Sequence, residues 1–286
     1  MVALSCKFDS GRSILSFSEN SSGPLPSIEP SPPPVIASSP ERKARVEDPP
    51  FSGWDVLILV GLMVGAIAVL GASVVIFAHL VLYPKVPIVD LAQNTGLALA
   101  AQFLSYLVVL IAMFKLIEMR TGRFWQPLRW NWPHNWTVFL VSGFVLYFVL
   151  IGLAQLLPIP KHLPIDRFFD SPRQAAVMTI FAVTMAPLME ELFFRGFLYP
   201  VLARRLGMVG GILLTSVAFG FLHGAQLKYS WAVLVIFLVG LALTIIRALT
   251  KSVAASFLVH VGYNGTLSVL LVISTGGFRH LERLNQ

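Results

Sequence analysis

Cysteine is nearly absent from this sequence. A single residue, Cys6, stands among 286, which excludes an intrachain disulfide and a metal site built from several thiolates. Charge is also scarce, because Asp, Glu, Lys and Arg make up only 12% of the chain, about half the fraction in an average soluble domain. So few charged side chains argue against a protein that faces water on all sides.

Apolar residues are abundant instead. They make up 56% of the chain, and the mean hydropathy is +0.77. A helix needs about 20 apolar residues to cross a membrane, and about seven runs approach that length. These runs cover roughly residues 56–82, 96–117, 137–157, 175–199, 208–225, 231–249 and 252–273. The sequence therefore predicts an all-α fold, a polytopic transmembrane helix bundle of about seven spans, with an even number as the alternative.

The composition divides the chain into four predicted segments. Residues 1–50 contain 11 Ser and 9 Pro, which favours a disordered tail over a packed core. Residues 51–170 hold the N-terminal transmembrane helices, and residues 171–275 hold a helical core with polar residues inside its apolar runs. Residues 276–286 form a short C-terminal tail.

The positive charge is interpreted as a sign of topology. The formal net charge is +7, but Lys and Arg lie between long apolar runs and form no continuous basic face, so we expect no nucleic-acid partner. With a cytoplasmic N-terminus, the inner connections carry 12 Lys and Arg and the outer ones 7, which favours this orientation by the positive-inside rule. No cleavable targeting segment is evident, so we expect a bacterial cytoplasmic membrane.

Three charged residues lie inside one apolar run. They are Glu190, Glu191 and Arg195, in APLMEELFFRG, and an unpaired central charge costs about 2.5–3.5 kcal/mol on insertion. In an α-helix Glu191 and Arg195 share a face as i and i+4, whereas Glu190 points about 140° away from Arg195. We expect Arg195 to pair with Glu191 and Glu190 to face another helix.

Two later runs also carry polar residues. Phe219 and His223 stand at i and i+4, so the phenyl ring can pack against the imidazole. His260 and Asn264 likewise share a helix face. Lipid cannot satisfy these groups, so the simplest arrangement is one internal polar site lined by three helices.

The chemistry of these groups allows two kinds of hydrolytic site. A glutamate held away from bulk water can act as a general base on water, while histidine or an asparagine amide stabilises the oxyanion. The same groups could instead bind a divalent metal such as zinc through Glu190, His223 and His260. The residue types leave open whether the site binds a divalent metal or uses no cofactor.

Three motifs in this order carry a resemblance to a known family. They are EExxxR at Glu190–Arg195, FxxxH at Phe219–His223 and HxxxN at His260–Asn264. This set resembles the CAAX-prenyl-protease-2-like and bacteriocin-processing intramembrane proteases, also called CPBP or Abi. The resemblance covers about residues 175–275, so the segment 171–275 looks like a CPBP catalytic core.

The resemblance implies endoproteolysis of a membrane-associated protein or peptide substrate. The implied catalytic residues are Glu190, which would activate water, and His223, His260 and Asn264, which would position that water or stabilise the oxyanion. The implied supporting residues are Glu191, Arg195 and Phe219. The family has been described both as metal-dependent and as glutamate-type. Its eukaryotic branch acts on prenylated CaaX proteins, but many bacterial relatives have no such substrate, so prenyl recognition stays open.

Non-catalytic interpretations also remain. Intramembrane His and Asn side chains often hold helices together, at about 0.6–2 kcal/mol per hydrogen bond, and the Glu–Arg group could be a structural ion-pair cluster. The alternative function is a non-enzymatic membrane protein, either a proton or ion carrier or a bacteriocin-immunity-type binding protein. The oligomeric state is not predicted.

Overall fold

The computed structural model describes residues 47–282, and within this range the chain is helical and contains no strand. The all-α prediction is confirmed, while most of the predicted tail 1–50 and the last residues of the predicted tail 276–286 lie outside the described residues. In chain order the elements are α1 (Gly53–Phe77), η1 (Ala78–Leu82), α2 (Ile88–Ala92), α3 (Thr95–Thr121), α4 (Trp136–Ala154), η2 (Pro164–Phe169), α5 (Pro172–Val183), α6 (Met185–Glu190), η3 (Glu191–Leu198), α7 (Tyr199–Leu222), η4 (Ala225–Leu227), α8 (Ala232–Thr250) and α9 (Val253–Ser274).

The helices are long and apolar enough to cross a membrane. Residues 47–282 contain six candidate spans, one of which is a 51-residue stretch over Pro172–Leu222. That stretch reverses direction at Gly207, whose φ of 75° and ψ of 174° are not helical. Beyond the turn, a Cβ on Gly211 would lie 2.8 Å from the Cα of Ala203. The stretch is therefore two spans, and the total agrees with the predicted count of about seven.

Several helices begin at side chains that cap their free N–H groups. Ser52 precedes α1 in a capping box with Asp55. Asn94 accepts a hydrogen bond from the Leu97 amide at the start of α3, and Ser252 accepts one from Ala255 at the start of α9. These caps satisfy donors that have no partner within the helix.

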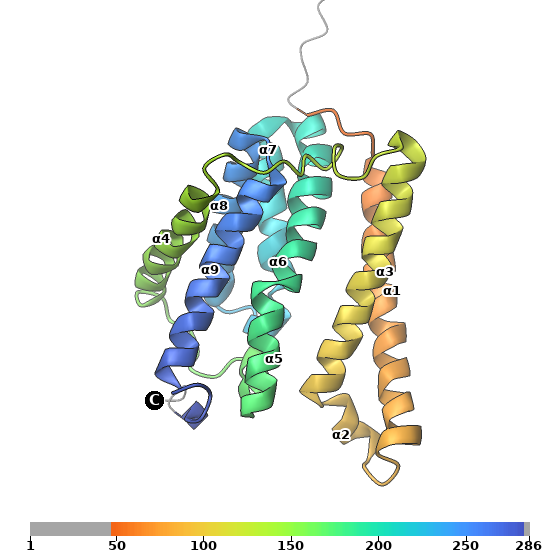
Figure 1. The fold of residues 1–286 in the computed structure, drawn as a ribbon, viewed down its shortest axis with the longest axis vertical. Coiled ribbons are helices and arrows are strands. Elements are labelled where there is room, and N and C mark those ends of the chain that lie inside the picture. The colour runs from red at the N-terminus through yellow and green to blue at the C-terminus, as the bar shows by residue number, and fades with distance from the viewer. Residues whose placement is uncertain (1–46, 283–286) are drawn as a thin grey trace, which may run out of the picture. The chain divides into compact units, whose positions relative to one another are not determined.

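The helices pack mainly in pairs. Helix α1 packs on α3, α7 on α8, and α4 on α9, as Figure 1 shows for the first and last pairs. The α4–α9 contact depends on two glycines: a Cβ on Gly143 would overlap the carbonyl oxygen of Val259, and one on Gly262 would overlap that of Leu140. This close approach fixes the position of α9.

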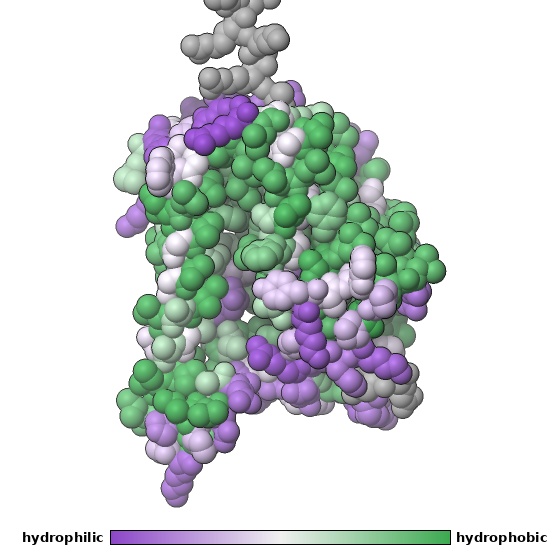
Figure 2. All heavy atoms as spheres, turned by 180° about the vertical axis from the view of Figure 1, so that it is seen from behind, coloured by the Kyte–Doolittle hydropathy of each residue, from purple (hydrophilic) through white to green (hydrophobic). Residues whose placement is uncertain are grey.

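The surface of the bundle suits a lipid environment. Helix α1 exposes Leu57, Ile58 and Val64 by 60–64% each. Figure 2 shows hydrophobic side chains over much of the visible face, with hydrophilic ones gathered near its two ends. Exposed apolar side chains on this scale would be unusual in water but are the ordinary surface of a membrane-spanning helix.

Candidate active site

A broken and widened helix presents the two glutamates. Helix α5 ends at Val183, and Thr184 has a φ of −113° and a ψ of −77°. Pro187 follows three residues later; it has no N–H to donate to the Val183 carbonyl, which accounts for the break. Glu190 closes α6, and Glu191 opens the π-helix η3. π-helical turns are rare in proteins, and those that occur are often found at functional sites.

Glu191 and Arg195 form a fully buried ion pair. The Nη1 atom of Arg195 lies 2.9 Å from Oε1 of Glu191, and both side chains have 0% exposure. The Arg195 guanidinium also donates to the carbonyl oxygen of Gly240 at 3.0 Å and to Oγ1 of Thr244 at 3.3 Å. The expected pairing is therefore present, and Arg195 joins η3 to α8.

His260 of α9 lies between the two glutamates. Its Nδ1 lies 3.0 Å from Oε1 of Glu191, and its Nε2 lies 3.8 Å from Oε2 of Glu190. An ionised carboxylate only accepts hydrogen bonds, so the hydrogen on Nδ1 points to Glu191 and Nε2 faces Glu190. The buried ion pair thus sets the orientation of this imidazole.

His223 faces Glu190 from the C-terminal end of α7. Its Nδ1 lies 2.9 Å from the carbonyl oxygen of Phe219, which fixes the hydrogen on Nδ1. Its Nε2 lies 3.9 Å from Oε1 of Glu190. The Phe219 ring packs against the imidazole with centroids 4.8 Å apart, and it also lies 4.5 Å below the Arg195 guanidinium carbon. The expected Phe219–His223 contact is present and extends to the ion pair.

Glu190 is the accessible carboxylate of the pair. Its side chain is 16% exposed, whereas that of Glu191 has no exposure. Each of its oxygens faces one imidazole Nε2, at 3.8 and 3.9 Å. These separations exceed a direct hydrogen bond and suit a bridging water molecule.

Asn264 lies one helical turn beyond His260 and makes a different contact. Its amide nitrogen donates to the carbonyl oxygen of Ala182 at 2.8 Å. Ala182 is near the end of α5, beside the break at Thr184. Asn264 therefore ties α9 to the broken helix, and its amide retains a second N–H.

The sequence pattern did not single out every residue of the site. Gly240 and Thr244 lie in an apolar run with no neighbouring charge, and only the packing of α8 against η3 brings them to Arg195. The ring of Tyr106 in α3 stacks on that of Phe181 in α5, with centroids 5.8 Å apart. A polar residue in an apolar helix was the only available signal for Thr244 and Tyr106.

The spacing of these side chains differs from that of a zinc site. Over residues 47–282 there is no group of three or more His, Cys, Asp or Glu side chains that could hold a metal ion. The Glu190 oxygens lie 3.8 and 3.9 Å from the two imidazole nitrogens, farther apart than the roughly 3.4 Å expected around zinc with bonds of about 2.0–2.1 Å.

Comparison with known proteins identifies the segment that carries this site. The search of curated proteins and the search of solved structures each gave no match. Residues 172–266, about a third of the chain, match the family model described as type II CAAX prenyl endopeptidase Rce1-like. This range contains both glutamates, both histidines and Asn264. The apolar helices and this match support an integral membrane protein whose segment 172–266 is Rce1-like, consistent with a CPBP family protease.

Proposed function

We propose that the protein is an intramembrane endopeptidase that hydrolyses peptide bonds of membrane-associated protein or peptide substrates with water activated by Glu190. The observation that supports this most is the position of Glu190. It is the accessible carboxylate of the buried cluster, and one imidazole Nε2 faces each of its oxygens. Charged groups at such depth are costly and mark functional sites.

The proposed reaction balances with these groups alone. Glu190 takes a proton from water as the water oxygen attacks the carbonyl carbon of the substrate. The C–N bond then breaks, and the proton held by Glu190 passes to the leaving amine. The Nε2 atoms of His223 and His260 accept a hydrogen bond from water when neutral and donate one to the oxyanion when protonated.

The remaining residues orient the two histidines or, in the case of Asn264, contact the oxyanion directly. Glu191 and Arg195 orient His260, and Phe219 orients His223, through the contacts described above. Asn264 is proposed to direct its second amide hydrogen to the oxyanion while the first holds α5. Preorganised groups of this kind lower the barrier because they need no rearrangement during the reaction.

The proposed orientation places the N-terminus in the cytoplasm. The connections with most Lys and Arg meet at one end of the bundle: Arg204 contacts Pro49, Arg129 contacts Glu47, and the Val253 amide contacts the Arg129 carbonyl. By the positive-inside rule this end is cytoplasmic. A bacterial cytoplasmic membrane is proposed as its location.

Cleavage of peptides by purified protein in detergent tests the proposed activity. A mixed panel of prenylated and unprenylated quenched peptides is incubated with wild type and with Glu190→Ala, each with and without chelator. We expect cleavage by wild type only, at a rate that chelator does not change. Comparing cleavage of the prenylated and unprenylated peptides shows whether the protein recognises the prenyl group. Loss of activity on chelation and recovery with zinc would contradict the metal-free step.

Proton flux into liposomes tests the carrier alternative. Flux that Glu190→Gln abolishes, in a protein that cleaves no member of the panel, would replace the protease proposal with a carrier. The protease proposal predicts no such flux.

A further inference from the structure

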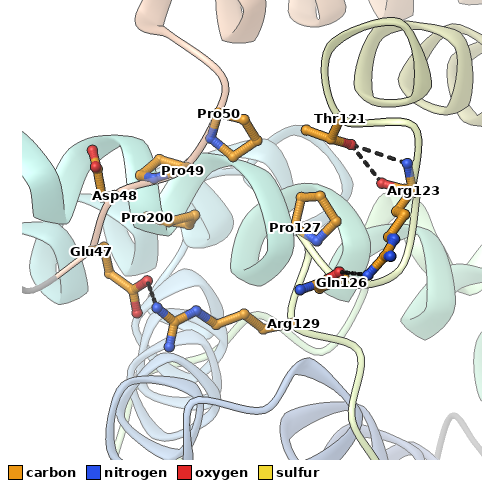
Figure 3. Close-up of a pocket in the computed structure, with 10 residues that line it drawn as sticks. All are labelled: Glu47, Asp48, Pro49, Pro50, Thr121, Arg123, Gln126, Pro127, Arg129 and Pro200. Carbon is orange, nitrogen blue, oxygen red and sulfur yellow. Dashed lines mark hydrogen bonds and ion pairs between the residues drawn. The ribbon is translucent and has the colours of Figure 1, made fainter. Parts of the chain in front are cut away.

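A short N-terminal segment crosses the end of the bundle ahead of α1. This segment, Glu47–Phe51, is called the strap. Figure 3 shows part of it on one side of a cavity, with Arg123, Gln126, Pro127 and Arg129 on the other side. The cavity has a volume of about 330 Å³, so the middle of the strap is not packed tightly against the segment opposite.

One end of the strap is held by a buried charge. Glu47 is 3% exposed, and its two oxygens lie 3.1 Å from Nη1 of Arg247 and 3.1 Å from Nη2 of Arg129. The Arg247 side chain is 1% exposed, and Glu47 is its carboxylate partner. A cation buried to this degree depends on its anion, so the Glu47 end is firmly attached to α8.

The other end of the strap packs on the helix that carries the candidate site. The ring of Phe51 stacks on that of Phe197 in η3, with centroids 4.1 Å apart and an interplanar angle of 10°. Phe51 shares a buried apolar cluster with Met189 and Leu192, which flank Glu190 and Glu191. The Phe51 end therefore contacts the segment that presents both glutamates.

Between these ends the strap is held through its backbone. Arg204 donates to the carbonyl oxygens of Pro49 and Phe51 at 2.9 and 3.0 Å. The side chain of Asp48 is 71% exposed, with an oxygen 3.8 Å from Arg204. Asp48 therefore carries the same charge as the neighbouring Glu47, but its side chain is exposed whereas that of Glu47 is buried.

The two attachments meet at the elements that hold Arg195. Gly240 and Thr244 of α8 receive the Arg195 guanidinium, and Arg247 lies one turn further along the same helix. The strap fixes α8 through Glu47 and η3 through Phe51. These are the two elements that the Arg195 hydrogen bonds join.

We propose that the strap is a positioning element for the candidate site, with Glu47 and Phe51 as its positioning residues. This inference rests on the proposed function. The strap holds η3 against α8, so that the Glu191–Arg195 pair keeps His260 and Glu190 in place. Loosening either end lowers kcat and leaves substrate binding intact. Glu47 and Phe51 in this way position the catalytic groups, although they lie about 140 residues before the glutamates.

Two variants of the full-length protein test the inference, with a matched control. Glu47→Gln removes the charge that Arg247 needs, and Phe51→Leu removes the ring stack without adding an unpaired charge. Asp48→Asn makes the same charge change as Glu47→Gln at an exposed position. We expect kcat to fall about 10- to 100-fold in the first two, with KM unchanged and the control equal to wild type.

Hydrogen exchange of residues 191–198, measured by mass spectrometry on the same proteins, gives a readout that does not depend on activity. We expect faster exchange in this segment for Glu47→Gln and Phe51→Leu and wild-type exchange for Asp48→Asn. If Glu47→Gln does not fold, Phe51→Leu decides. Wild-type exchange in Phe51→Leu would overturn the inference, and it would do so whether or not the wild-type protein proves to be a protease.

Discussion

Glu190 and Glu191 are adjacent in the chain but lie in different surroundings. Glu191 is fully buried and paired with Arg195, whereas Glu190 is 16% exposed and lies near the Nε2 atoms of His223 and His260. The same residue type therefore has two expected roles, one structural and one chemical.

Replacing Arg195 by Met should destabilise the fold. The substitution leaves the Glu191 carboxylate buried without its cation and removes the hydrogen bonds to Gly240 and Thr244. Loss of one partner of a buried pair costs about 3–5 kcal/mol. Unfolding in detergent measures this loss, with the exposed Arg205→Met as control. Equal stabilities of the two variants would show that the pair is not structural.

Thr244 tests the contribution of α8. In Thr244→Val the side chain keeps its shape but no longer accepts from Nε of Arg195, which costs about 1–3 kcal/mol when the donor is left buried. We expect lower stability and a lower kcat. Thr250→Val on the same helix is the control, because Thr250 is exposed and makes no hydrogen bond to Arg195. Its hydroxyl donates to the Ile246 carbonyl oxygen and accepts from the Ser252 amide. If Thr250→Val lowered stability and kcat as much as Thr244→Val, Thr244 would have no special role in holding Arg195.

The contact between α4 and α9 should tolerate no side chain at Gly143. A Cβ there would overlap the Val259 carbonyl oxygen, next to His260. Gly143→Ala should shift α9 and cost about 1–3 kcal/mol, as overpacking does, and it should also reduce cleavage. Gly152→Ala, on the same helix with open space around it, should behave like wild type in both assays. Normal cleavage by Gly143→Ala would mean that the position of α9 is not critical.

Much of the fold could be predicted from the sequence, because membrane spans depend on length and hydropathy. The Glu191–Arg195 and Phe219–His223 contacts could also be predicted, since both are i,i+4 pairs within one stretch of chain. The partners of Arg195 on α8 could not be predicted, because they lie 45 and 49 residues from Arg195 in the sequence. Their contact depends on how α8 packs against η3.

The strap shows a second limit. Residues 47–50 have the Pro-rich character of the preceding tail, and local composition contains no sign that Glu47 lies against Arg247, 200 residues away. The π-helical form of η3 is a further example, because an apolar run with i,i+4 polar pairs predicts an ordinary α-helix. Both features arise from tertiary contacts that override local preference.

The central claim is that Glu190 is the catalytic glutamate and Glu191 is the structural one. The most direct test measures kcat and thermal stability of Glu190→Gln beside Glu191→Gln, two variants that remove the same charge at neighbouring positions. We predict that Glu190→Gln lowers kcat by about 10²–10⁴-fold and keeps its melting temperature, whereas Glu191→Gln lowers the melting temperature. A Glu190→Gln protein that cleaves substrate at the wild-type rate would contradict the account.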